Sequence, residues 1–415
     1  MRLTQSTKKK EDFAQMGVHT LIDTRAFIIA LMALLTPANG LAAEPATRDA
    51  ARDSAEPALL RVGPARQLAR PSDAARVARN GDIVEIDAGV YDGDVAVWRQ
   101  HNLTIRGTGG RAHLRAGGAS AEGKAIWVLK GSNTTIERLE FSGAAVADRN
   151  GAGIRLEGAG LTLRDCYFHH NENGILGNAD PASDILIEHS EFAYNGFGDG
   201  FSHNIYAGGR SLTVRFSYLH HAYVGHNLKS RALQNHIIYN RIMDEIDGSS
   251  SYAIDLPNGG LAYVIGNVIQ QGPATENPTV VAFGSEGYKH AVNELYFVNN
   301  TVMNDLPAGG RFVFVKAGAG TVRLVNNVFA GPGEVLSGPG EMSNNLVVGK
   351  SDFVDPANFD FRLKDGTLVV GRGIAPGRAG SLDLRPIAEY SHPLQERPRR
   401  GAGALDLGAF EYQPN

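Results

Sequence analysis

A short apolar motif recurs along the chain, and this recurrence constrains the fold more than any other feature. Alternating apolar residues lead to a small or amide residue and then to a second apolar pair, as in residues 237–242 and 324–329. The small or amide position, or its apolar counterpart in the first copy, falls at positions 139, 166, 190, 217, 240, 267, 300 and 327. A period of about 27 residues indicates stacked units that bury their apolar faces against one another.

The composition of each copy predicts a β-structure. Residues alternate between apolar and polar, β-branched residues are common, and glycine and asparagine mark the turns. No stretch inside a copy shows the periodicity of a helix, and the fixed consensus of leucine-rich repeats is absent. We therefore predict an all-β fold, a right-handed parallel β-helix, in which Asn240, Asn267, Asn300 and Asn327 stack as an amide ladder at one turn.

Four segments are expected. Basic residues, the apolar run 26–35 and the small residues 38–43 suggest a signal peptide over 1–43, hence a secreted or periplasmic protein. A polar linker over 44–58 precedes the β-helix, which is predicted over 59–350. Residues 71–81 are predicted to form a helix that caps its N-terminal end, and residues 351–415 an extended tail packed on the last coils.

Charge and cysteine content exclude several classes of protein. The formal net charge of −4 gives no reason to expect a nucleic-acid or membrane-surface partner. Cys166 is the single cysteine, so neither an intramolecular disulfide nor a cysteine-based zinc site can form. We expect a monomer.

Polar residues concentrate in three segments, 203–206, 225–231 and 254–260, that lie about one repeat apart. If Leu228 faces the core, Ile205 and Ile254, which lie one repeat before it and one repeat after it, set the same phase in the adjacent coils. Parallel strands lie roughly 4.8 Å apart, so the outward side chains would share one surface. The residues predicted to face outward there are Asn204, Tyr206, Asn227, Lys229, Arg231 and Asp255. The residues predicted in or beside the adjoining turn are His220, His221, Tyr223 and His226.

These residue types suit β-elimination from a uronic-acid polymer. A base must remove the weakly acidic proton next to the carboxylate, and cations or amides must neutralise the charge that develops there. We assign the base to Lys229, next to Arg231, and the proton donor to Tyr206 or His226. The residues expected to contact the carboxylate or the sugar are Asn204, Asn227, His203, His221, Tyr223 and Asp255. The predicted partner is an acidic polysaccharide.

The segment around the lysine also resembles a known family. Lys229-Ser230, followed by Asn235 and by residues 240–242, resembles the lysine segment of the β-helix polysaccharide lyases that act on alginate and on chondroitin or dermatan sulfate. The resemblance implies a lyase with Lys229 as its base.

Two departures from that family affect the site. Residues 222–226 contain no acid where the family has its calcium ligands, and residues 252–257 contain no arginine where the family has a catalytic one. Arg231 or Tyr206 would have to substitute for that arginine. The sequence therefore assigns no cofactor, and it leaves Ca²⁺ open without its usual acidic ligands.

Other interpretations stay open. Asp244, Glu245, Asp247 and Asp255 could supply the paired carboxylates of a glycoside hydrolase. A uronate epimerase would begin with the same proton abstraction. His203, His221 and His226 could bind a metal, although their spacing matches no established ligand pattern. A solenoid that binds glycans without cleaving them would show a scattered aromatic platform, whereas this chain gathers its unusual residues within three coils.

Overall fold

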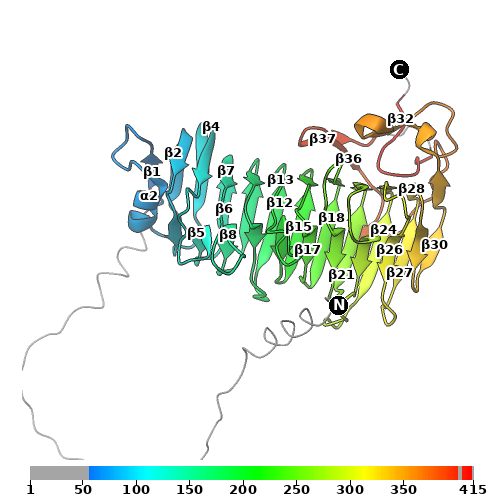
Figure 1. Ribbon diagram of the computed structural model, residues 1–415, viewed down its shortest axis with the longest axis horizontal. Helices are drawn as coiled ribbons and strands as arrows, with labels where there is room; N and C mark the ends of the chain where they lie inside the picture. The colour runs from blue at the N-terminus through cyan, green and yellow to red at the C-terminus, as the bar shows by residue number, and fades with distance from the viewer. Residues whose placement is uncertain (1–55, 401–403, 414–415) are drawn as a thin grey trace, which may run out of the picture. The chain divides into compact units, whose positions relative to one another are not determined.

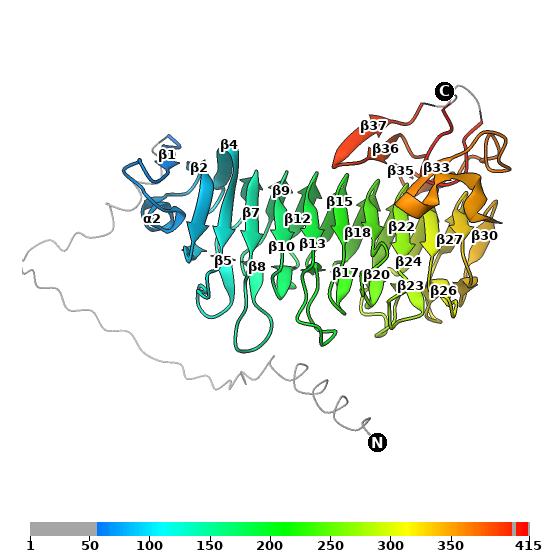
Figure 2. The ribbon, with the colours of Figure 1, turned by 45° about the horizontal axis from the view of Figure 1, so that its top comes forward.

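The chain folds as a parallel β-helix, as the repeat predicts. The computed structural model describes residues 56–400 and 404–413. In this part, successive coils stack side by side along one axis (Figures 1 and 2). The predicted signal peptide and most of the predicted linker lie outside the described residues.

Each complete coil contributes one strand to each of three parallel sheets. The first sheet comprises β1 (Leu59–Val62), β2 (Ile83–Asp92), β4 (Thr104–Arg115), β6 (Thr134–Glu137), β9 (Leu161–Arg164), β12 (Asp184–Glu188), β15 (Ser211–Arg215), β18 (Gln234–Ile238), β21 (Leu261–Ile265), β24 (Glu294–Val298), β27 (Val322–Val325) and β30 (Glu341–Ser343).

The second sheet follows after a short corner, and the long strands β2 and β4 bend from the first sheet into it. Its other strands are β7 (Leu139–Ser142), β10 (Tyr167–His169), β13 (Glu191–Ala193), β16 (Tyr218–His220), β19 (Arg241–Met243), β22 (Val268–Gln271), β25 (Thr301–Asn304), β28 (Val328–Ala330) and β31 (Leu346–Val348).

The third sheet closes each coil. Its strands are β3 (Ala96–Trp98), β5 (Ala125–Leu129), β8 (Ala152–Leu156), β11 (Asn173–Leu176), β14 (Ile205–Ala207), β17 (His226–Ser230), β20 (Tyr252–Leu256), β23 (Thr279–Phe283), β26 (Arg311–Val315) and β29 (Glu334–Ser337). Because the strands pair in register, equivalent side chains of successive coils form columns.

Columns of apolar side chains fill the interior. The rings of Phe141, Phe168 and Phe192 stack with centroids 4.8 Å apart at each step. Each such side chain is fully buried, which stabilises the fold by about 1.5–3 kcal/mol relative to an exposed position. The core is therefore continuous from coil to coil.

The predicted asparagine ladder is present at the corner between the first and second sheets. The side-chain amides of Asn240 and Asn267 each donate to the Oδ1 of the next asparagine over 3.0 Å, and that of Asn300 donates to Asn327 over 3.1 Å. Each Oδ1 also accepts the backbone N–H of the preceding asparagine. The ladder thus satisfies polar groups that would otherwise be buried without partners.

The predicted capping helix and C-terminal tail are both present. The helix expected over 71–81 is present as α2 (Pro71–Val77), with Ala74 and Ala75 buried against the first coils. The tail comprises η3 (Lys350–Asp352), β32 (Phe353–Asp355), η4 (Pro356–Asn358), β33 (Asp360–Leu363), β34 (Arg378–Ala379), β35 (Leu382–Asp383), β36 (Ala388–Ser391) and β37 (Gln395–Pro398).

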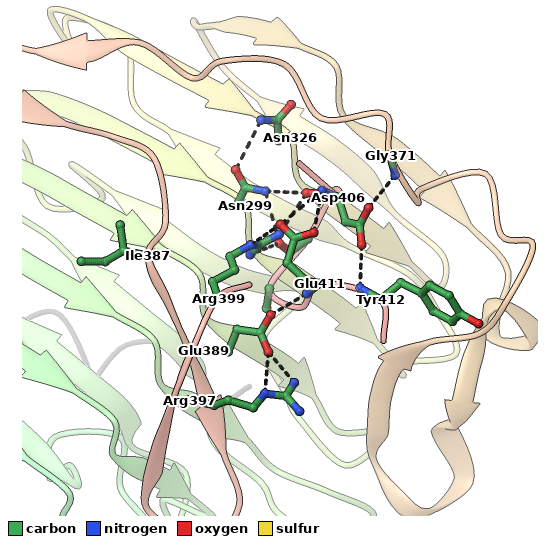
Figure 3. Close-up of polar contacts among 12 residues, drawn as sticks. Asn299, Asn326, Gly371, Ile387, Glu389, Arg397, Arg399, Asp406, Glu411 and Tyr412 are labelled. Atoms are coloured by element: carbon green, nitrogen blue, oxygen red, sulfur yellow. Dashed lines mark hydrogen bonds and ion pairs between the residues drawn. The ribbon is translucent and has the colours of Figure 1, made fainter. Parts of the chain in front are cut away.

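The tail packs on the outer face of the second sheet. Phe353 and Phe361 join an apolar cluster with Tyr218 and Met243. Beyond β37, the side chain of Arg399 is buried and binds Glu411 at 2.7 Å (Figure 3). Within the described part of the chain, no helix is long and apolar enough to cross a membrane.

Candidate active site

The outer column predicted on the third sheet forms. Tyr206 on β14 pairs in register with Lys229 on β17, which pairs with Asp255 on β20. The neighbouring column of Ile205, Leu228 and Ile254 is fully buried in the core, as predicted. The sequence period therefore placed these outer side chains correctly relative to one another.

Lys229 is less accessible than its outward position suggests. Its side-chain nitrogen lies 3.1 Å from Glu286 Oε1 and 3.5 Å from Asp255 Oδ2. Lys229 is only 9% exposed and Asp255 only 2%. The ammonium group thus joins a buried carboxylate to a second one at the surface.

Arg231 completes the charged group. Its Nε donates to the Tyr206 hydroxyl over 2.7 Å, and one terminal nitrogen donates to Asn258 Oδ1 over 2.6 Å. The other terminal nitrogen lies 2.7 Å from Glu286 Oε2. The two oxygens of Glu286 are therefore divided between Lys229 and Arg231.

The pKa values of the two carboxylates beside Lys229 are shifted in opposite directions. Burial raises the pKa of Asp255, and the nearby Lys229 only partly offsets this. Burial also pushes the pKa of Glu286 upward, but Lys229 and Arg231 outweigh it and hold that pKa below its ordinary value. The side chain of Glu286 is 44% exposed, so this carboxylate is held as an anion at the surface of the site.

His226 and His203 lie beneath this group. Their rings stack with centroids 4.4 Å apart, and the His226 backbone N–H donates to His203 Nδ1 over 3.0 Å. Burial, reinforced by the charge of Lys229, lowers the pKa of His226 to about 3. A ring that stays neutral and buried is a poor proton donor, which leaves the half-buried Tyr206 as the better one.

The expected orientation of Asn204 and Asn227 is wrong. Both are fully buried and form part of a second, inner ladder at the corner before the third sheet. Asn204 Nδ2 donates to Asn227 Oδ1 over 2.8 Å, and Asn227 Nδ2 donates to Asp244 Oδ1 over 3.2 Å. Strand alternation fails at this corner because the chain turns there, and the amides satisfy the polar groups inside the turn. Neither can contact a substrate.

His221 and Tyr223 lie near the same corner, but their contacts are with residues outside the Lys229 group. His221 Nε2 lies 3.0 Å from Asp247, and its Nδ1 lies 2.6 Å from His220 Nδ1. Tyr223 is exposed, with its ring against the backbone of Gly198. The contacts found in the described part of the chain connect neither residue to Lys229. The expected group of His203, His221 and His226 therefore does not converge on one metal position.

Glu286, Ser285 and Asn258 were not predicted as site residues. Glu286 and Ser285 lie in the loop after β23, and the Ser285 hydroxyl donates to Asp255 over 3.0 Å. The one available signal was the longest interval between copies of the repeat, from position 267 to position 300, which indicates an enlarged loop in that coil. The sequence did not show that this loop folds back over Lys229.

The residues around Lys229 do not suit calcium. Residues 222–226 offer no carboxylate, and the nearest ones, Asp255 and Glu286, already pair with Lys229 and Arg231. Those cations would repel a divalent cation.

The loop acids considered for hydrolysis are dispersed. Asp244 is buried in the inner ladder, Glu245 accepts a hydrogen bond from Tyr218 on the second sheet, and Asp247 pairs with His221. Of the four acids, Asp255 alone belongs to the Lys229 group.

Comparisons with known proteins agree with this architecture. The family described as "Right handed beta helix region" matches residues 124–351, more than half of the chain. The crystal structure of pectate lyase Pel9A superposes with a TM-score of 0.56 at 13% sequence identity, covering 86% of this chain and 97% of that chain. ORF18 of Geobacillus virus E2 gives a TM-score of 0.38 at 15% identity, covering 65% of this chain and 53% of that chain. No curated protein sequence matches.

Proposed function

The chain belongs to the family of right-handed β-helix proteins, and we propose that it cleaves an acidic polysaccharide by β-elimination at the Lys229 site. One observation carries the proposal: Lys229 and Arg231 together hold a carboxylate, that of Glu286, at the surface of the third sheet. Bidentate binding of a carboxylate by cations is strong and directional. The same pair suits the carboxylate of a uronic acid.

Substrate binding then becomes an exchange of carboxylates. Glu286 sits on a loop and is partly exposed, so a uronate can take its place beside Arg231. Arg231 stabilises the negative charge that develops on the substrate carboxylate as the neighbouring proton leaves. Glu286 thus acts as an internal substitute for the substrate in the free protein.

The proposed elimination moves one proton onto the protein and one off it. Lys229, an ammonium in the free protein, first releases a proton to solvent. Its neutral amine then takes the proton from the carbon next to the carboxylate, and the C–H electron pair forms a carbon–carbon double bond. The glycosidic C–O bond breaks, and the leaving oxygen takes a proton from the Tyr206 hydroxyl. Arg231, hydrogen-bonded to that hydroxyl, stabilises the phenolate that remains.

Hydrolysis is the second candidate, favoured by the divergent environments of Asp255 and Glu286. A carboxyl with a raised pKa beside one with a lowered pKa is the pattern of an acid and its partner carboxylate. The burial of Asp255 argues against it, because a general acid must reach the glycosidic oxygen.

The test is to incubate the purified protein with a panel of uronate polymers and one neutral polysaccharide. Elimination yields an unsaturated product with a new ultraviolet absorbance, from the uronate polymers alone. New reducing ends without that absorbance favour hydrolysis, and altered uronate stereochemistry without cleavage favours epimerisation. Binding with no chemical change favours a glycan-binding solenoid. As part of the proposal, the protein acts outside the cytoplasm, where such polymers occur.

A further inference from the structure

A cluster of histidine and glutamate side chains lies on the second sheet, away from the Lys229 group. It comes from three successive coils, β4, β7 and β10 (Figure 2). His113 pairs in register with Glu140, and His169 pairs with Ser142, two positions beyond Glu140. The parallel register therefore brings the three functional side chains together on the outer face.

Their potential ligand atoms converge on one point. Glu140 Oε1 lies 3.3 Å from His113 Nδ1 and 3.1 Å from His169 Nε2. One ligand atom from each of the three residues lies within 4.8 Å of the other two. The side chains are 20%, 25% and 17% exposed for His113, Glu140 and His169, so an ion could enter from one side.

In each histidine, the ring nitrogen that faces away from Glu140 also has a polar partner. His113 Nε2 lies 2.7 Å from the Ser142 hydroxyl, and His169 Nδ1 lies 2.8 Å from His170 Nδ1. Metal-binding histidines characteristically have this second nitrogen fixed by a hydrogen bond, which sets the tautomer and the ring orientation. The two rings are thus oriented from behind toward the position between them.

We propose that His113, Glu140 and His169 bind a divalent transition metal ion of the Zn²⁺ type. Two imidazole nitrogens and one carboxylate oxygen form a ligand set that suits zinc and leaves a coordination position open. Without the ion, Glu140 Oε1 faces a nitrogen of each ring. With it, His113 donates from Nε2 to Ser142 and His169 donates from Nδ1 to His170, so both facing nitrogens offer lone pairs.

The chain contains a partial copy of this cluster two coils further on. Glu191, His220 and His221 repeat the arrangement of Glu140, His169 and His170, with His220 Nε2 3.3 Å from Glu191. Tyr167 pairs in register with Glu191, at the place that corresponds to His113. The copy therefore lacks the second imidazole and serves as a matched control.

The test is a competition titration of the full chain, first treated with a chelator, between Zn²⁺ and a chromogenic zinc indicator. We expect one tightly bound equivalent that Ca²⁺, which prefers oxygen ligands, does not displace. Ser142→Ala should weaken binding by about 10–100-fold, and His113→Asn or His169→Asn by more. His220→Asn should leave the bound equivalent unchanged.

Several outcomes would overturn the proposal. They are the absence of a bound equivalent in the wild-type chain, binding unaffected by His113→Asn, and a loss in His220→Asn as large as that in His169→Asn. Thermal unfolding followed by circular dichroism checks that each variant is folded. If a histidine variant fails to fold, the near-isosteric Glu140→Gln takes its place, with retention of full affinity counting against the site. Zn²⁺ should also raise the unfolding temperature of the wild-type chain and not that of Glu140→Gln.

Discussion

Glu286 Oε2 lies 2.7 Å from the guanidinium of Arg231, although the two residues belong to different coils. The other oxygen of the same carboxylate lies 3.1 Å from Lys229. A loop residue thus neutralises both cations of the candidate active site. If the site acts on uronates, this carboxylate competes with the substrate.

Removing the charge of Glu286 tests that competition. Glu286→Gln should lower KM for the acidic polymer by about tenfold, or ~1.4 kcal/mol, with kcat nearly unchanged. Initial rates measured across substrate concentrations give both constants. Glu276→Gln, an exposed acid of the loop between β22 and β23, is the control. Abolished turnover in Glu286→Gln would instead identify Glu286 as a catalytic carboxylate and favour hydrolysis.

Replacing Lys229 should affect both activity and stability. Lys229→Met should abolish turnover, since the proposed base is lost. It should also destabilise the fold by about 3 kcal/mol, because Asp255 is left buried without its cation. The double variant Lys229→Met/Asp255→Asn should regain most of the stability and none of the activity. Urea unfolding and product absorbance measure the two effects separately, and turnover in either variant would exclude Lys229 as the base.

Asp244 should make stability depend on pH. Burial raises the pKa of Asp244 to about 6, while its hydrogen bonds from Ser250 and Asn227 and the nearby His221 act in the opposite direction. The folded state then holds a proton that the unfolded state has already released, so stability falls as pH rises from about 4 to about 6. At about 1.4 kcal/mol per pKa unit, the free energy of unfolding falls by on the order of 3 kcal/mol over this pH range.

Asp244→Asn removes this titration. The amide can still accept from Asn227 and donate to the Ser250 hydroxyl, so the inner ladder persists. The variant should be more stable than the wild type at pH 7.5 and of similar stability at pH 4. Free energies of unfolding at the two pH values check this. An equal change at both values would contradict a raised pKa.

The buried ion pair between Arg399 and Glu411 should keep the C-terminal tail folded against the coils. The side chains of Arg399 and Glu411 are 1% and 4% exposed (Figure 3). Arg399→Met leaves Glu411 buried without its cation and should cost about 3–5 kcal/mol. Limited proteolysis should then cut the tail earlier than in the wild type. Arg362→Met, at an arginine whose side chain is 56% exposed, is the control, and equal protease resistance of the two variants would refute the role of the pair.

Several features of the fold were predictable from the sequence because they repeat in every coil. Strands of a parallel solenoid stack in register, so the period of the repeat fixes which side chains share a column. That was enough to place Leu228 in the core, Lys229 between Tyr206 and Asp255, and Asn240 and Asn267 in one ladder.

The rest was decided by tertiary structure, at the corners and loops where the period gives no information. Asn204 and Asn227 turn inward because the corner breaks strand alternation and their amides find partners inside it. Glu286 reaches Lys229 because an enlarged loop folds back over the third sheet. Stacking repeats through local pairing that the sequence encodes, whereas these contacts depend on how non-repeating segments pack against the finished coils.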